Sequence, residues 1–571
     1  MTARHLRVLR AFGTQAQMGA QLGEQSREFG NGRSLVEYYK NLPQNLTLGA
    51  GGGNWEERLI VAALEPWLTH ACGRLEQARP AEYRARSRAF LDVLDGDADG
   101  SRYANVMDLF QNLVGVAGRL NLVPNGHPLD GLAKRRQPLL WRTSPPPACT
   151  SAVVWGDATD DGRMLHARNF DFPGIGVWDT EPTVTFCSPN TGLKYGYVGT
   201  RGADVPGVTA FNEAGIVVTA HTRLHKHVRF DGRTLVDLGH EVVRTCDAID
   251  AAIALITSTP VASAWGICIS SARERRAVVI ETTGRASAVV SPERYGVLTC
   301  SNLNRDTALQ RDEICFCAGW TASSNGRERV MRRGIEREWG SVTPQTLSAL
   351  LGSQEDPDVE GYTRTAGPIP AQACSVQSVV VDAQNQRIWV SVGACPTGLG
   401  GWVPVPWEWD TGATAIASSG AEAACAREAG VIAYTEATRL AQLASPVSKI
   451  ADALEVGTLH NPDDPSLLFM LGGAALSAGE PSRALAFFER ALGSERNPGA
   501  RVRLHAWAAR AAVHVSRDAD ARRHRDAVAA DTSVALSRVR HDVRREQRAP
   551  LSMSKLRRTK LALELLDLVV G

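Results

Sequence analysis

The sequence lacks the features that would indicate a membrane protein or a disulfide-stabilised secreted domain. The first twenty residues contain basic side chains but no apolar core like that of a signal peptide, and no later run approaches the roughly 18 consecutive apolar residues of a membrane span. The 11 cysteines are few for 571 residues, odd in number and scattered, so neither a disulfide framework nor a zinc site is indicated. We therefore expect a cytoplasmic protein with reduced thiols, no membrane span, no metal and no other cofactor.

The charge is also nearly balanced. Lysine and arginine total 63 against 61 aspartate and glutamate residues, a formal net charge of +2, which gives no reason to expect nucleic acid as a partner. The hydrophobic fraction of 44% and the charged fraction of 22% are typical of globular chains. A chain of 571 residues is too long for one hydrophobic core, so its length predicts several domains.

The first predicted domain, residues 1–148, is mostly helical. Residues 56–75 and 85–94 carry apolar side chains at three- and four-residue spacing, as in amphipathic helices. The pattern changes after the proline-rich residues 144–147, where short β-like runs separated by turn residues begin.

These runs, together with helical patterns at residues 235–256 and 309–339, predict a layered α+β domain over residues 149–410. The predicted strands are residues 150–155, 164–170, 183–187, 215–219, 277–281, 375–381 and 387–392.

The third predicted domain, residues 411–571, is all-helical and rich in Ala, Leu and Arg. Its small and aromatic residues Gly472, Gly479, Ala484, Phe488 and Ala491 have the spacing of a tetratricopeptide repeat, and an Asn-Pro pair recurs after 36 residues. We expect helical hairpins that could bind a protein partner or mediate self-association. The arginine-rich residues 501–560 could be a solvated helix face or could bind an acidic partner. We expect this region to be dispensable for the chemistry of the preceding domain.

The sequence around Cys149 predicts a chemical role for this residue. It opens a β-run, an Asp-Asp-Gly turn at residues 160–162 reverses the chain, and a second run ends in Arg168-Asn169-Phe170-Asp171. Such a hairpin can return Arg168 and Asp171 to the neighbourhood of Cys149. A guanidinium favours the reactive thiolate, and a carboxylate can orient an ammonium group. If the Ala148–Cys149 bond is cut, the new α-amine can serve as the base and Asp171 can hold it.

Cys149-Thr150-Ser151 followed by Arg168-Asn169-x-Asp171 resembles the start of the mature chain in N-terminal-nucleophile cysteine hydrolases. The pattern is most similar to the penicillin-forming acyl-coenzyme A:6-aminopenicillanic acid acyltransferase family, with bile-salt hydrolases, penicillin V acylases and acid ceramidase as more distant relatives. Further weak resemblances lie at residues 13–23, 211–216, 299–302 and 375–393. The resemblance extends over about residues 5–410 and leaves the helical repeats outside.

The resemblance implies a four-layer αββα sandwich and an inactive precursor that activates by cutting itself. It implies Cys149 as the nucleophile, Asp171 as the group that positions its amine, Arg168 beside the thiolate and Asn302 as a donor to the oxyanion. Asn212 and the segment His221-Thr222 are further candidates for oxyanion or substrate contacts. This chain has Ser301-Asn302-Leu303-Asn304 where the acyltransferases more often have Thr-Asn-His, so Asn304 is the alternative donor.

The expected activity is hydrolysis or acyl transfer at amide bonds of small N-acylated compounds, through an acyl-cysteine intermediate. Acyl transfer from an acyl-coenzyme A donor to an amine is the first alternative, and a non-enzymatic helical-repeat scaffold with a decayed catalytic domain is the second. His221 could instead pair with Cys149 as in papain-type proteases. Arg364 could match a late arginine of the bile-salt hydrolases. Trp402, Trp407 and Trp409 could line an acyl pocket or pack at a domain edge.

Overall fold

The computed structural model describes residues 5–27, 38, 55–94, 100–120, 148–315, 317–409, 415–417 and 428–570. The proline-rich residues 144–147 and the predicted domain boundary at residue 410 lie outside these ranges. Within them, no helix combines the length and the apolar character that crossing a membrane requires.

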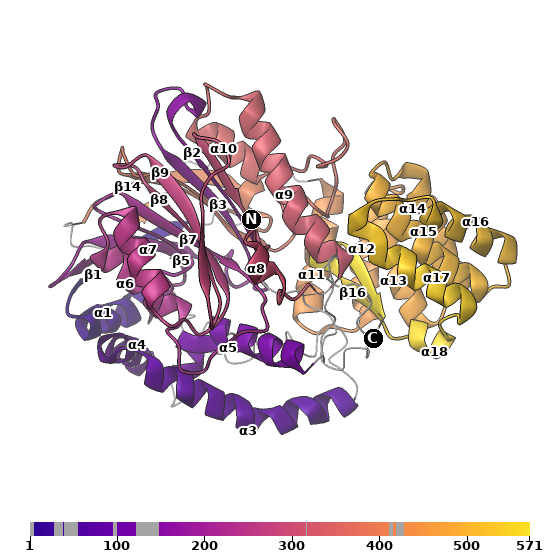
Figure 1. Cartoon of the computed structure of the whole chain (residues 1–571), viewed down its shortest axis with the longest axis horizontal. Coiled ribbons are helices and arrows are strands. Elements are labelled where there is room, and N and C mark those ends of the chain that lie inside the picture. Colours follow the sequence, from indigo (N-terminus) through magenta and orange to yellow (C-terminus); the bar gives the residue numbers. More distant parts are fainter. Residues whose placement is uncertain are drawn as a thin grey trace.

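Two β-sheets packed face to face form the centre of the molecule (Figure 1). The larger sheet has the strand order β10-β9-β8-β7-β6-β5-β4-β1-β15 and the smaller has the order β11-β2-β3-β12-β13-β14. The strands of the larger sheet are β1 Leu6–Gly13, β4 Pro182–Pro189, β5 Tyr195–Thr200, β6 Thr209–Asn212, β7 Ile216–Thr222, β8 Trp265–Ser271, β9 Arg276–Thr282, β10 Ser287–Val290 and β15 Ala415–Ala417. Those of the smaller sheet are β2 Ala148–Val154, β3 Leu165–Asp171, β11 Val297–Cys300, β12 Ser375–Asp382, β13 Arg387–Val392 and β14 Gly401–Pro406.

Helices cover the outer faces of both sheets. Helices α6 (Leu235–Thr245) and α7 (Ile249–Ser258) pack on the larger sheet, while α9 (Ala318–Arg337) and α10 (Pro344–Leu351) pack on the smaller one (Figure 1). Strands β2, β3 and β12 are buried along their whole length, because a sheet covers one face and helices cover the other. The layers thus run helix, sheet, sheet, helix, and the predicted mixture of strands and helices is confirmed.

The N-terminal segment contributes a strand as well as helices. Its helices are α1 Gln15–Arg27, α3 Trp55–Ala78, α4 Ala81–Val93 and α5 Gly100–Arg119. Strand β1 was not predicted; it runs parallel to β4 and lies between β4 and β15 in the larger sheet. The predicted boundaries at residues 148 and 410 therefore separate stretches of sequence that share one sheet.

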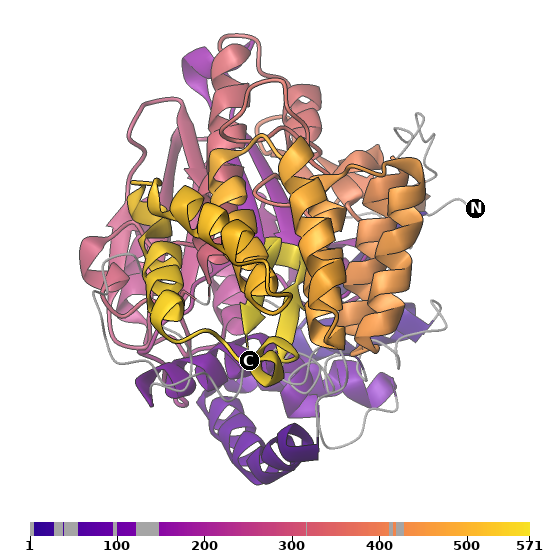
Figure 2. The ribbon, with the colours of Figure 1, turned by 90° about the vertical axis from the view of Figure 1, so that its right-hand side faces the viewer.

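The C-terminal region consists mainly of helices packed in successive pairs (Figure 2). These helices are α11 Ala429–Gln442, α12 Val447–His460, α13 Pro465–Ala478, α14 Pro481–Ser494, α15 Pro498–Val513, α16 Asp518–Ala529, α17 Ser537–Arg548 and α18 Met553–Leu556. The prediction of an all-helical domain over residues 411–571 is wrong at both ends. Strand β15 joins the larger sheet near its start, and β16 (Thr559–Ala562) and β17 (Asp567–Val570) form a hairpin at its end. The tetratricopeptide-like pattern stays a prediction, although a Cβ on Gly472 would lie 2.3 Å from the Phe488 ring, so α13 and α14 need a small residue there.

This helical region packs tightly against the sheets. Leu565 lies in the same apolar core as Trp320 of α9, the backbone N–H of Gly319 donates to Asp567 at 2.8 Å, and β15 extends the larger sheet. Many of its arginines pair within the region, as Arg510 does with Glu546 at 2.8 Å. Removing everything after residue 410 would therefore expose apolar core, which changes the expectation that the region is dispensable.

Candidate active site

Cys149 is the second residue of β2, which pairs with β3 as the predicted hairpin. Ala148 lies opposite Asp171, Cys149 opposite Phe170 and Ser151 opposite Arg168 in the antiparallel register. The bond between Ala148 and Cys149 therefore lies inside a strand, and both residues are buried. The ladder brings the candidate nucleophile and the Arg168-Asn169-Phe170-Asp171 sequence together, as the sequence predicts.

Arg168 directly contacts the thiol. Its Nη2 lies 3.1 Å from Cys149 Sγ and also donates to the Ala220 carbonyl at 2.7 Å, while its Nη1 donates to Thr209 Oγ1 at 2.7 Å. The guanidinium also lies over the Phe170 ring, 4.8 Å from its centroid. These contacts hold the cation at the sulfur, buried at 1% exposure.

Asp171 is oriented by Ser375, the first residue of β12. Ser375 Oγ donates to Asp171 Oδ1 at 2.6 Å, and Asp171 is fully buried. Asp171 Oδ2 accepts no hydrogen bond within the described residues, and its nearest cation is Arg327, at 3.7 Å. The carboxylate thus retains an oxygen that can accept from a new ammonium group.

Asn302, and not Asn304, contacts Cys149. Asn302 Oδ1 accepts from the Cys149 backbone N–H at 2.9 Å and from Arg327 Nη2 at 2.8 Å, while its Nδ2 donates to the Thr222 carbonyl at 3.1 Å. These partners fix which end of the amide is oxygen. Asn304 instead donates to Glu313 through both its backbone and its side chain.

Arg327 is the residue that the sequence analysis missed. It projects from α9, buried at 1% exposure, and donates to the Cys149 carbonyl, to Thr150 Oγ1 at 2.8 Å and to Asn302 Oδ1. Its surroundings in the sequence, Arg327-Glu328-Arg329, are those of an ordinary charged helix face. Only the packing of α9 on β2 distinguishes Arg327 from its more exposed neighbours.

Two of the weaker candidates have other partners. The amide of Asn212 donates to the carbonyls of Val243 and Cys246 at 2.9 and 2.8 Å, so it fastens the end of α6 to the β6–β7 turn. His221 Nε2 lies 2.9 Å from Ser151 Oγ, a contact that does not involve Cys149. Thr222 enters the site through its carbonyl, which accepts from Asn302.

The tryptophans and Arg364 also have structural surroundings. Trp407 stacks on Phe211 with ring centroids 4.5 Å apart, and Trp409 packs edge-on against Phe186, so both fill the sheet-to-sheet core at its margin. Trp402 packs, partly buried, against another core on the helix-covered face of the smaller sheet. Arg364 forms buried ion pairs with Glu495 and Asp356 rather than with Cys149.

Burial dominates the electrostatics of the intact chain. It raises the pKa of the Cys149 thiol above its ordinary value, and the Arg168 guanidinium offsets this only in part. Burial likewise raises the pKa of Asp171 against the opposing effect of Arg327. The pKa of His221 is held well below its usual range by burial and by the positive charge of Arg168, so His221 is neutral. The thiol accordingly keeps its proton at neutral pH before any cleavage.

No cluster of three or more histidine, cysteine, aspartate or glutamate residues within the described ranges is arranged to hold a metal ion.

Comparison with known families identifies a relationship for the middle of the chain. The family model described as acyl-coenzyme A:6-aminopenicillanic acid acyl-transferase matches residues 158–318, a span that includes Arg168, Asp171 and Asn302 and begins nine residues after Cys149. The match confirms the resemblance that the sequence motifs indicate for this part of the chain. No curated protein matches.

Two solved structures are similar to parts of the chain. One is a mutant of the conjugated bile acid hydrolase from Clostridium perfringens, at 12% identity and a TM-score of 0.33, covering 47% of this chain and 96% of that one. The other is the Caenorhabditis elegans N-acylethanolamine-hydrolyzing acid amidase ortholog, at 15% identity and a TM-score of 0.28, covering 41% of this chain and 93% of that one.

Proposed function

We propose that this protein is an amide hydrolase or acyltransferase of the N-terminal-nucleophile type, with Cys149 as its nucleophile after cleavage of the Ala148–Cys149 bond. The observation that carries the proposal is the convergence of Arg168, Asn302 and Arg327 on the atoms of Cys149, with Asp171 beside them. The family match over residues 158–318 supports the same class of chemistry. A decayed scaffold would have no reason to keep these buried polar groups together.

The first step proposed is an acyl shift within β2. Cys149 Sγ attacks the Ala148 carbonyl carbon, an S–C bond forms, the C–N bond breaks, and the thiol proton passes to the departing nitrogen. Water then hydrolyses the thioester, which gives the Ala148 carboxylate and restores the thiol. Asn302 Oδ1 already accepts from this nitrogen at 2.9 Å, so the released amine has a partner from the start.

Turnover of substrate repeats the same chemistry. The thioester of Ala148 on Cys149 is an acyl-cysteine, and a substrate acyl group would occupy the place that the Ala148 acyl group leaves. The free α-amine takes the thiol proton, Asp171 holds the resulting ammonium, and Asn302 can offer its second Nδ2 hydrogen to the oxyanion. The thiolate forms the S–C bond, the substrate C–N bond breaks, and the ammonium returns its proton to the leaving amine. Water or an acceptor amine then attacks the thioester and releases the thiol. Small N-acylated compounds are the proposed substrates, and an acyl-coenzyme A donor with an amine acceptor is the alternative.

An intact-mass spectrum of the purified protein tests the proposal. We expect fragments of 148 and 423 residues from the 571-residue chain, and a single chain from Cys149→Ala. Cys268→Ala is the matched control, because it removes a buried cysteine of β8 that lies in a different apolar cluster from Cys149. A wild-type protein that stays intact and yet hydrolyses amides would show that the mechanism is wrong.

The choice between water and an amine as acceptor needs a second assay. Processed protein is incubated with N-acyl p-nitroanilides of graded chain length and, separately, with acyl-coenzyme A and a primary amine. Release of p-nitroaniline that depends on Cys149 supports hydrolysis. Release of free coenzyme A only when the amine is present supports acyl transfer.

A further inference from the structure

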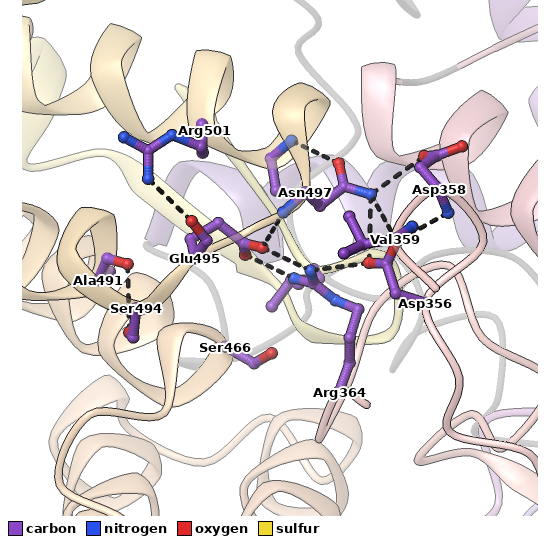
Figure 3. A network of polar contacts seen from close by, with 12 residues as sticks. Asp356, Asp358, Val359, Arg364, Ser466, Ala491, Ser494, Glu495, Asn497 and Arg501 are labelled. Atoms are coloured by element: carbon purple, nitrogen blue, oxygen red, sulfur yellow. Dashed lines mark hydrogen bonds and ion pairs between the residues drawn. The ribbon is translucent and has the colours of Figure 1, made fainter. Parts of the chain in front are cut away.

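A buried polar network joins the C-terminal helices to the segment between α10 and β12 (Figure 3). Arg364 Nη1 and Nη2 each lie 2.8 Å from an oxygen of Glu495, and Nη1 also lies 3.1 Å from Asp356. Asn497 Nδ2 lies 3.0 Å from oxygens of both Asp356 and Asp358. Arg364, Asp356, Glu495 and Asn497 are all buried.

The same segment, residues 352–374, ends at the candidate active site. The Pro370 carbonyl accepts from Asn169 Nδ2 at 2.9 Å, and Asn169 lies two residues before Asp171. The segment then leads directly into Ser375, whose hydroxyl orients Asp171 at 2.6 Å. Ser375 follows Arg364 by only eleven positions along the chain.

The segment also fixes the helix that carries Arg327. At Gly326 of α9 an added Cβ would lie 2.4 Å from the Pro368 side chain and 2.6 Å from the Pro368 carbonyl, so the helix backbone rests directly on the segment. Gly367, one residue before Pro368, has a positive φ of +125. A Cβ added to Gly367 would lie 3.1 Å from the side chain of Leu566 in the C-terminal region. The segment is thus held on one side by the C-terminal region and supports Asp171 and Arg327 on the other.

We propose that Glu495 and Asn497 are positioning residues for the N-terminal-nucleophile site, acting through Arg364, Asp356 and the segment 352–374 on Asp171. The C-terminal helical region is then a working part of the catalytic unit and not an appended binding module. This inference rests on the proposed function, because Asp171 needs positioning only if an α-amine forms at Cys149. Within the part of the chain that the structure describes, the other ionisable groups that interact electrostatically with Asp171 are Arg168, Arg327 and the thiols of Cys149 and Cys374.

The positioning of Asp171 affects the ionisation of the α-amine that cleavage creates at Cys149. A well-placed Asp171 keeps the α-amine protonated to higher pH, and the ammonium in turn favours the Cys149 thiolate. If the segment loosens, the ammonium loses its proton at lower pH, and the thiol pKa rises. A half-unit rise in the thiol pKa lowers the thiolate fraction at neutral pH by about threefold.

The test measures, by peptide mass spectrometry, the alkylation of Cys149 by iodoacetamide in processed full-length protein. The pH is varied from about 5 to about 9, the range over which a thiol and an α-amine titrate. We expect Glu495→Gln to lower the rate at pH 7 by about threefold, in the same direction as Asp171→Asn. Asn497→Ser is the second variant: serine keeps the N-cap of α15 but is too short to bridge Asp356 and Asp358. It should shift the profile the same way even if Glu495→Gln fails to fold.

Glu546→Gln is the matched control, since it breaks the Arg510–Glu546 pair inside the same helical region without touching the segment. It should lower the melting temperature and leave the Cys149 profile unchanged. The inference is overturned if the Cys149 alkylation rates of Glu495→Gln and Asn497→Ser follow the wild-type pH profile and only their melting temperatures are lower. A wild-type chain that is never processed would instead overturn the proposed function, so the two failures are distinguishable.

Discussion

The side-chain oxygen of Asn302 accepts a hydrogen bond from the backbone nitrogen of Cys149 at 2.9 Å, while the Asn302 amide nitrogen faces the Thr222 carbonyl. In the proposed mechanism this one side chain has two separable functions. Its oxygen holds the nitrogen that departs during self-cleavage, and its second amide hydrogen serves the oxyanion of a bound substrate.

Replacement of Asn302 by aspartate separates these functions. Asn302→Asp keeps an acceptor for the Cys149 nitrogen and for Arg327 but loses the donor, so we expect self-cleavage to continue and turnover to fall by about 100-fold or more. Asn302→Leu should block both self-cleavage and turnover. Asn304→Leu is the control, because Asn304 contacts Glu313 and not Cys149. The fraction cleaved and the turnover per processed molecule are measured in parallel. Normal turnover in Asn302→Asp would remove the amide from the list of oxyanion donors.

Arg168 and Asp171 should act at different stages. Asp171→Asn keeps the shape but removes the charge that faces the ammonium, so we expect a processed enzyme with at least about tenfold lower activity. Arg168→Ala should slow alkylation of Cys149 at neutral pH, because loss of the guanidinium 3.1 Å from the sulfur raises the thiol pKa further. Arg168→Lys is the control that retains the charge. If both variants only melt at a lower temperature and keep their specific activity once folded, Arg168 and Asp171 support the fold and are not catalytic.

The two products of cleavage should stay associated. Arg79 pairs with Asp237 and Arg86 pairs with Asp204, at 2.8 and 2.6 Å, and both pairs are buried between the first 148 residues and the rest. Arg86→Ala leaves a buried carboxylate without its cation, so we expect a loss of about 3–5 kcal/mol in the free energy of unfolding. Glu82→Gln removes the more exposed pair between Glu82 of α4 and Arg244 of α6 and should cost under about 1 kcal/mol. Equal effects in denaturant titrations would contradict this assignment.

His166 should make the protein less stable in mild acid. Burial and the neighbouring Arg168 lower the pKa of His166 to about 3. At pH values below the ordinary pKa of histidine, His166 binds a proton in the unfolded state but not in the folded state. The free energy of unfolding therefore falls as the pH drops from about 6.5 towards 3. Relative to His166→Gln, the wild type should lose up to about 1.4 kcal/mol of unfolding free energy per pH unit there. The exposed His460→Gln variant is the control, and equal slopes in wild type and His166→Gln would refute the prediction.

The hairpin of β2 and β3 and the grouping of Cys149, Arg168 and Asp171 could be predicted because they depend on local sequence. A turn at Asp160-Asp161-Gly162 and two β-like runs define the register within one short stretch. Asn302 could be predicted only through the resemblance, since 153 residues separate it from Cys149.

Arg327 and the β1 strand could not be predicted in the same way. Arg327 is one of several arginines on α9, and its burial follows from the packing of α9 on β2. Strand β1 pairs with β4, which is far away in the sequence, and the local periodicity of hydrophobic residues does not identify such a distant partner. Both depend on long-range packing.

The Ala148–Cys149 bond lies in a buried part of β2 that pairs with β3, and this position has a consequence for quality control. A protease in solution needs an accessible, extended segment, and both residues of this bond are buried in the β2–β3 ladder. An unfolded chain, in turn, lacks the arrangement of Arg168, Asn302 and Arg327 around the thiol. Cleavage by the proposed route is therefore confined to molecules in which the smaller sheet and α9 have assembled, and a cut chain would be a permanent record that this part of the fold formed.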